Sequence, residues 1–163
     1  MSSASAVLTS PSVQRVRQAL ERAGLDADIV ELPGAARTAR AAAEFLGCDV
    51  AQIANSLVFR GETSGTAMLV MSSGARRVDT GALQKLVGEP VGKADADFVR
   101  LHTGFAIGGV APAGHGLTQV FVEKSLSAFD ELWAAAGHPH TVFRLSFEQL
   151  LRITNGVPAE LAA

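Results

Sequence analysis

The spacing of apolar residues along the chain predicts five helices. The first begins at Ser10, a favourable N-cap residue, with Pro11 at the first helical position. Val13, Val16 and Leu20 then recur at helical spacing and form one apolar stripe. Comparable helix signals recur over residues 38–47, 80–87, 94–101 and 146–155.

Short apolar runs between these helices predict strands over residues 27–32, 56–60, 67–71, 119–123, 130–135 and 141–145. The second and third runs are continuously apolar and are joined by a glycine-containing loop, so we expect a central hairpin covered on both faces. Residues 88–92 contain Pro90 and are predicted to be irregular, and residues 105–110 to be a short strand or a glycine-rich loop. This order of elements is typical of an α/β (α+β) domain with a mixed sheet.

Composition limits the class of protein. The chain has 163 residues, of which 48% are apolar and 18% charged. This composition excludes a disordered protein, and a chain of this length can bury a core. We expect a flexible arm over residues 1–10 and a single domain over residues 11–160. No apolar run approaches the roughly 18 to 20 residues of a membrane span, and the N-terminal residues lack a secretory signal. The single cysteine, Cys48, excludes an internal disulfide and indicates a reducing compartment, so we expect a cytoplasmic protein without a membrane partner.

The charge pattern limits the partners. The net charge of −2 gives no general attraction to nucleic acid, so we expect no DNA partner, and any RNA contact must be local. Arg15 lies off the apolar stripe of the first helix and is expected to be solvated. Trp133 is most simply interpreted as a core residue.

Four segments stand out as places where the chemistry could lie: residues 53–59, 72–79, 104–112 and 137–140. In this order, after a threonine (Thr38) that opens an alanine-rich helix, they resemble the YbaK/ProX family of aminoacyl-tRNA deacylases. The resemblance extends from about the first helix to the last. It implies the fold shared with the editing domain of bacterial prolyl-tRNA synthetases, a mixed and partly barrel-like central sheet flanked by helices.

The resemblance also implies an activity, which is the hydrolysis of the ester between a wrong, small amino acid and the 3′-ribose of a tRNA, with water as nucleophile. The expected partners are the 3′ aminoacyl end of a mischarged tRNA and an aminoacyl-tRNA synthetase or elongation factor, and no cofactor is expected. We expect substrate contacts from Thr38, Ser56, Ser73, Gly74, Asp79, Pro112 and His115. For Asp79, a helix cap before Thr80 is an equally good interpretation.

Gly108 and Gly109 are the best candidates for stabilising a tetrahedral oxyanion. Glycines allow positive φ and expose backbone N–H groups that side chains would shield, and pre-aimed amides stabilise the charge that develops during ester hydrolysis. An ordinary tight turn is the alternative interpretation of the pair.

Asn55 is the point at which this chain departs from the family pattern. Most family members resemble A-K-[ST]-L here, with a lysine that contacts the substrate, whereas this chain has Asn55 between Ala54 and Ser56. Asparagine offers one acceptor and two donors but no charge. Either the site works through Asn55 and other groups, or the chain is a catalytically weakened module that binds aminoacyl-tRNA, a small ligand or a synthetase.

Three histidines could assist the reaction. His138 is a candidate general base on the attacking water and His115 lies close to the glycine-rich segment. The alternative is that they are ordinary loop residues. Together with His140 they could in principle hold zinc, but the family needs no metal, so no metal site is expected.

Overall fold

The computed structural model describes residues 6–34 and 38–163, so the predicted arm over residues 1–10 lies partly outside the described residues. The helices are α1 (Pro11–Arg22), α2 (Ala39–Leu46), α3 (Thr80–Val87), α4 (Ala96–Thr103) and α5 (Phe147–Thr154). The strands are β1 (Ile29–Glu31), β2 (Ile53–Gly61), β3 (Ala67–Ser73), β4 (Val91–Lys93), β5 (Val120–Glu123), β6 (Leu132–Ala135), β7 (Thr141–Leu145) and β8 (Val157–Ala159). Within these ranges no helix is long and apolar enough to cross a bilayer.

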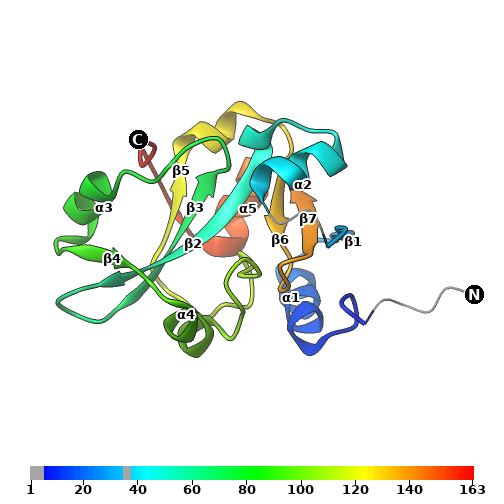
Figure 1. Cartoon of the computed structure of the whole chain (residues 1–163), viewed down its shortest axis with the longest axis horizontal. Helices are drawn as coiled ribbons and strands as arrows, with labels where there is room; N and C mark the ends of the chain where they lie inside the picture. The colour runs from blue at the N-terminus through cyan, green and yellow to red at the C-terminus, as the bar shows by residue number, and fades with distance from the viewer. Residues whose placement is uncertain (1–5, 35–37) are drawn as a thin grey trace, which may run out of the picture.

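The strands form one mixed sheet, as the sequence predicts. Their order is β1-β7-β6-β2-β3-β5-β8, and β4 also pairs with β2 (Figure 1). β2 and β3 form the expected antiparallel hairpin, whereas the β2–β6, β3–β5 and β5–β8 pairs are parallel. Every residue of β3 is buried, so this strand is covered on both faces, whereas β2 has exposed and partly buried residues.

The helix starts are fixed locally by the residues expected to cap them. The side chain of Ser10 accepts a hydrogen bond from the Val13 amide, and Thr38 accepts one from the amide of Ala41. Ser146 forms a capping box with Gln149 at the start of α5. Each cap satisfies a backbone donor that has no partner inside the helix.

Two short strands were not expected from the sequence. The prediction that residues 88–92 are wholly irregular is wrong, because β4 begins at Val91 and pairs antiparallel with β2. β8 contains Pro158 and adds parallel to β5 at the outer edge of the sheet. Proline lacks an N–H group, so it is tolerated at such an edge and not in a central strand.

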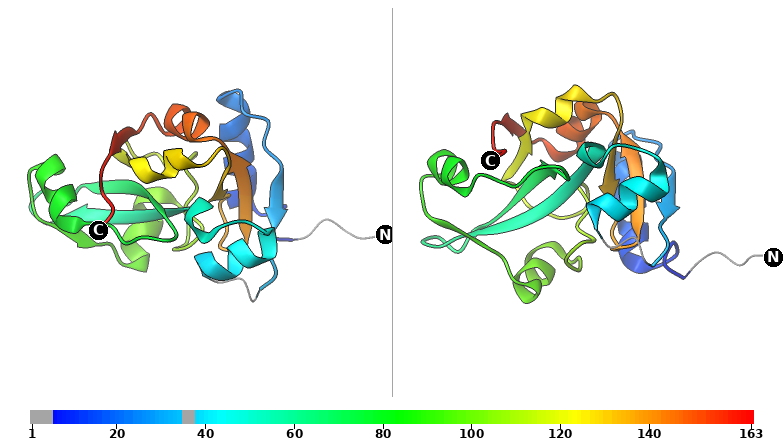
Figure 2. Two further views of the ribbon diagram at one scale, coloured as in Figure 1. Left: turned by 90° about the horizontal axis from the view of Figure 1, so that it is seen from above. Right: turned by 45° about the horizontal axis from the view of Figure 1, so that its top comes forward.

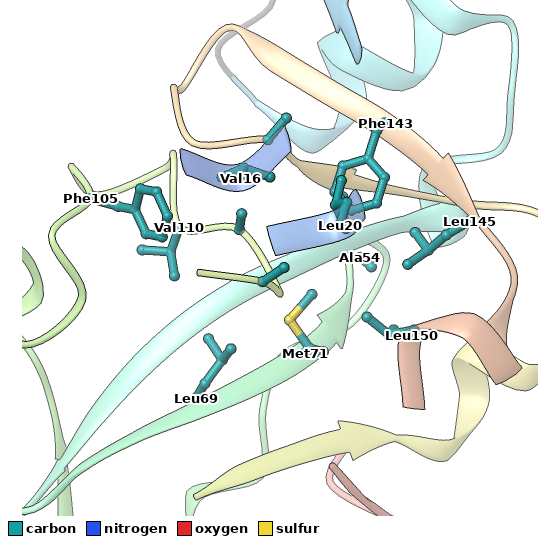
Figure 3. Close-up of a cluster of buried hydrophobic side chains, with 14 of the residues drawn as sticks. Val16, Leu20, Ala54, Leu69, Met71, Phe105, Val110, Phe143, Leu145 and Leu150 are labelled. Atoms are coloured by element: carbon teal, nitrogen blue, oxygen red, sulfur yellow. The ribbon is translucent and has the colours of Figure 1, made fainter. Parts of the chain in front are cut away.

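The main core lies between the central hairpin, α1, α5 and the segment that follows α4. Figure 3 shows Val16 and Leu20 of α1 together with Phe105, Val110 and Phe143, and all five are nearly inaccessible to solvent. The two views of Figure 2 show α1 and α2 at the end of the molecule opposite α3 and α4. The sheet therefore reaches from one group of helices to the other.

The C-terminal residues pack against the sheet through the side chain of Glu123. This carboxylate is 2% exposed and accepts hydrogen bonds from the amides of Ser125, Leu161 and Ala162. The amide of Ala163 donates to the carbonyl of Arg77. Ordered contacts thus continue beyond residue 160.

Candidate functional site

A pocket of about 560 Å³ lies along one edge of β2, at a stretch of that edge where no strand pairs with it. On this edge β2 pairs with β6 only through Ile53 and Ala54, and with β4 only from Phe59 to Gly61. Between them, residues 55–58 have a strand neighbour on the β3 side alone. The described walls come from Leu32 after β1, from α2, β2, β4, the β4–α4 connection and α4, and from the glycine-rich loop, β6 and β7. Figure 1 shows where these elements lie. The divergence of β4 and β6 therefore creates the opening.

The backbone of Ser56 faces this opening. On the open edge, the carbonyl of Val58 accepts a hydrogen bond from the amide of Ala94 (3.2 Å). On the β3 side, the carbonyl of Ile53 accepts one from the amide of Gly74 (2.7 Å). Because backbone groups alternate in direction along a strand, the N–H and C=O of Ser56 point the same way as those of Val58. Ser56 thus offers a ligand one main-chain donor and one acceptor.

The side chain of Asn55 lies on the face of the sheet shared with Ser72. The two residues are directly opposite in the β2–β3 register, which places their Cβ atoms about 5 Å apart. The Oγ of Ser72 is buried without a hydrogen-bond partner, and Asn55 makes no side-chain hydrogen bond within the described residues. Asn55 lines the pocket, so its amide is free to bind a ligand.

The two glycines of the glycine-rich loop have different roles. Gly108 lines the pocket and has φ +85°, a conformation that favours glycine. The amide of Gly109 donates to the carbonyl of Ala106 at 2.9 Å, so it is engaged in a turn. A Cβ on Gly109 would come within 3.0 Å of the His138 backbone. In this conformation Gly108 faces the ligand space, and Gly109 allows the loop to approach the β6–β7 turn.

Arg15 holds the start of the glycine-rich loop in place, and the sequence does not predict this role. Its guanidinium lies 4.2 Å from the ring centroid of Phe105, and Nη2 donates to the carbonyl of Thr103 at 3.0 Å. A Cβ on Gly104 would lie 2.7 Å from Nη1. The expectation that Arg15 is solvated is therefore wrong, because helical spacing locates a side chain relative to its own helix and not relative to a distant loop.

Several residues expected to contact substrate have structural roles outside the described lining. The Oγ of Ser73 donates to the carbonyl of Ala51, and a Cβ on Gly74 would lie 2.7 Å from the carbonyl of Val50. Asp79 caps α3 through the Ala82 amide. Pro112 is buried in the loop. Of the expected substrate contacts, Thr38 and Ser56 lie in the pocket wall, together with Asn55 and Gly108.

None of the three candidate histidines is among the described lining residues of the pocket. His115 is 7% exposed and its Nδ1 accepts a hydrogen bond from the amide of Leu117. Nδ1 of His138 accepts one from the amide of His140, while Pro139 of the same turn reaches the pocket. Burial, assisted by His140, lowers the pKa of His138 against the opposing influence of Glu31. In the ranges that the structure covers, no three His, Cys, Asp or Glu residues gather as a metal site would require.

His115 should make the stability of the protein depend on pH just below neutrality. Burial lowers the pKa of this imidazole below its ordinary 6.5, and a backbone interaction with Pro112 opposes the shift only in part. The unfolded chain therefore binds a proton first as the pH falls, and stability decreases from about pH 6.5 towards the lower, folded pKa. Urea unfolding of the wild type between pH 7.5 and 5.5 should show this loss. His115→Gln should reduce the slope, leaving the contribution of His138, and an unchanged slope would contradict the assignment.

Sequence reasoning did not place Trp133 or Lys93 in the pocket. Trp133 was expected in the core, but it is partly exposed and forms one wall of the pocket. Lys93 lines the pocket from β4, a strand that the sequence did not reveal. Among the described lining residues, Lys93 alone carries an ionisable side chain. No local pattern could have identified it, because its position depends on the pairing of β4 with β2.

The chain is similar to known proteins in sequence and in fold. The chain matches the family described as the aminoacyl-tRNA editing domain over residues 34–153. The uncharacterised protein YwhH of Bacillus subtilis (strain 168) is 28% identical over 140 residues, which is 85% of this chain and 88% of YwhH. A solved structure of a protein proposed to be a trans-editing enzyme for prolyl-tRNA synthetase is 44% identical, with a TM-score of 0.88, and the match covers 94% of this chain and 98% of that one.

A more distant structure, of the hypothetical protein APE2540, shares the fold at 24% identity with a TM-score of 0.83, and the match covers 91% of this chain and 99% of that one. The resemblance to the YbaK/ProX deacylases is confirmed at the level of the family, and so is the mixed α/β fold with its helices. The family match spans most of the sheet and all described lining residues of the pocket except Leu32. This chain belongs to the aminoacyl-tRNA editing domain family.

Proposed function

We propose that the protein is a trans-editing deacylase that hydrolyses the ester of a mischarged small amino acid on tRNA. Membership of the editing family supports the reaction class, and the 44% identical structure supports a role in trans. The observation that carries the proposal is the pocket on the unpaired edge of β2, where Asn55, the Ser56 backbone and Gly108 meet. The mischarged tRNA, with a synthetase or elongation factor, is the corresponding partner.

The inner part of the pocket is suited to an uncharged ester. Its inner walls are apolar, with Ile53, Ala42 and Val142 among them, and such surfaces accept a small side chain. The Ser56 amide on the open edge and the loop at Gly108 are the groups we assign to the developing oxyanion, which backbone donors stabilise strongly in a partly closed site. The side-chain amide of Asn55 then orients the attacking water or the ester carbonyl.

Asn55→Ala should lower kcat/KM for deacylation by about 100-fold, the effect typical of losing one well-placed donor to the reacting group. The measurement is the release of amino acid from a panel of mischarged tRNAs. Gln18→Ala, on the exposed face of α1, is the control and should retain wild-type activity. A wild-type protein without turnover on any member of the panel would overturn the proposal.

A second candidate is a binding module without catalysis. The observation that favours it is the described lining itself, which holds neither a carboxylate nor a histidine to act as general base. Asn55→Lys distinguishes the two functions. If the protein is a module that has lost catalysis, the wild type should bind aminoacyl-tRNA without hydrolysing it, and only Asn55→Lys should show turnover. If the protein is an active deacylase, the wild type should show turnover with Asn55 in place.

A further inference from the structure

Lys93 gives the pocket a positive charge at a place remote from Asn55. It is the one ionisable side chain in the described lining, and it is exposed at the pocket margin. Glu62 lies beside the neighbouring Gly92, yet no ion pair or side-chain hydrogen bond forms at Lys93 within the described residues. Its ammonium group is therefore free to meet a ligand.

The strand register places Lys93 relative to the reacting groups. Lys93 is directly opposite Phe59 in the β2–β4 pair, and residues opposite one another project from the same face. Asn55 lies four residues from Phe59 along β2, so it shares this face at about 13 Å along the strand, given ~3.3 Å per residue. The two side chains thus stand at opposite ends of the unpaired edge.

This separation matches the shape of the proposed substrate. An ester held at Ser56 and Asn55 is attached to a ribose, which carries its base and a 5′-phosphate away from the reacting carbonyl. The flexible four-carbon stem of lysine can bring a compact cation back along the edge. We therefore expect room for a nucleoside between that cation and Asn55, and a phosphate is the anionic group of a terminal nucleotide.

We propose that Lys93 binds the 5′-phosphate of the terminal nucleotide of the aminoacylated tRNA. The inference rests on the proposed deacylase function. Lysine binds phosphate as a point charge, and phosphate contacts fix the register of a nucleic acid on a protein. In a chain with a net charge of −2, a single local cation contributes much of the attraction for that end of the substrate. Lys93 is thus a binding residue that positions the ester and leaves the chemical step to the groups at Asn55.

Two minimal substrates separate phosphate binding from chemistry, namely the 3′-aminoacyl esters of adenosine and of adenosine 5′-monophosphate. For the phosphorylated ester, Lys93→Met should lower kcat/KM about 10-fold, mainly through KM, as expected for a lost charged hydrogen bond of at least 1.4 kcal/mol. For the adenosine ester, the variant should equal wild type. Lys93→Arg should retain most of the activity on both. Lys85→Met, on the exposed side of α3, is the matched control.

Other outcomes would overturn the inference. Equal losses on both esters would place Lys93 at the reacting carbonyl, and no loss on either would show that it does not contact the substrate. Binding of adenosine 5′-monophosphate and adenosine, measured by calorimetry, tests the same contact without turnover. Wild type should prefer the monophosphate and Lys93→Met should lose that preference. If no substrate is hydrolysed but this preference is found, the deacylase proposal fails while the phosphate site stands; without the preference, the site fails too.

Discussion

Gly137→Ala should lower the free energy of unfolding by about 3 kcal/mol, because the new methyl group has neither the backbone conformation nor the space that it needs. Gly137 has φ +105°, and a Cβ there would lie 2.7 Å from the carbonyl oxygen of Ser12 and 2.9 Å from Cγ2 of Val16. A positive φ costs an L-residue about 1–2 kcal/mol, and overpacking adds about 1–3 kcal/mol. Urea denaturation followed by circular dichroism measures the difference.

Gly34→Ala is the matched control for this substitution. Among the described residues, a Cβ on Gly34 meets no atom within 4 Å, and Gly34 does not have a positive φ, so the stability of this variant should stay within about 0.5 kcal/mol of wild type. Equal stability of the two variants would show that α1 does not pack closely on the β6–β7 turn. The same turn supplies Pro139 to the pocket and leads into Thr141 of β7, which also lines it, so we also expect a raised KM in folded Gly137→Ala.

Glu123→Gln should destabilise the protein by about 2–3 kcal/mol at neutral pH. Burial favours a higher pKa for this carboxyl, but hydrogen bonds from Ser125, Leu161 and Ala162 outweigh burial and lower the pKa below its ordinary 4.5. Replacing the carboxylate weakens three charge-assisted hydrogen bonds and brings an unpaired NH₂ group into a buried site.

The lowered pKa of Glu123 also fixes the sign of a pH effect. The stabilisation is complete above the ordinary pKa of a glutamate and is lost as the pH falls through the lower, folded value. The difference in unfolding free energy between wild type and Glu123→Gln should therefore shrink below about pH 4.5. Glu160→Gln, at an exposed position, is the control. A loss no larger than that of the control would show that the carboxylate does not anchor the C-terminal residues.

Most of the fold could be predicted because its signals are local. The caps at Ser10, Thr38 and Ser146 and the apolar runs of the hairpin act within a few residues, and the structure has these elements where the pattern indicates. β4 and β8 were missed because each has three residues and depends on a partner strand. No periodicity develops over so short a stretch, and Pro158 normally argues against a strand.

The candidate site was predicted only in part for a related reason. Asn55 and Gly108 stand in segments that carry a family pattern, so sequence alone indicated them. Lys93 and Arg15 act across the fold, and their importance depends on the pairing of β4 and on the position of the glycine-rich loop. Conversely, Ser73 also belongs to one of these segments, but its Oγ donates to the carbonyl of Ala51 and Ser73 is not among the described lining residues of the pocket. A motif thus indicates a region of the molecule, and only tertiary packing decides which members face the ligand.

The unpaired edge of β2 has a consequence for how such a domain can diverge. A strand edge on the outside of a protein invites pairing with other chains, but here the free groups of Ser56 lie in a recess between β4 and β6. Main-chain donors are encoded by every amino acid except proline. Mutations along this strand can therefore exchange the side chains, as at Asn55, while the main-chain N–H and C=O groups on the unpaired edge are kept. Specificity can drift on such a scaffold while the main-chain groups of Ser56 stay in place.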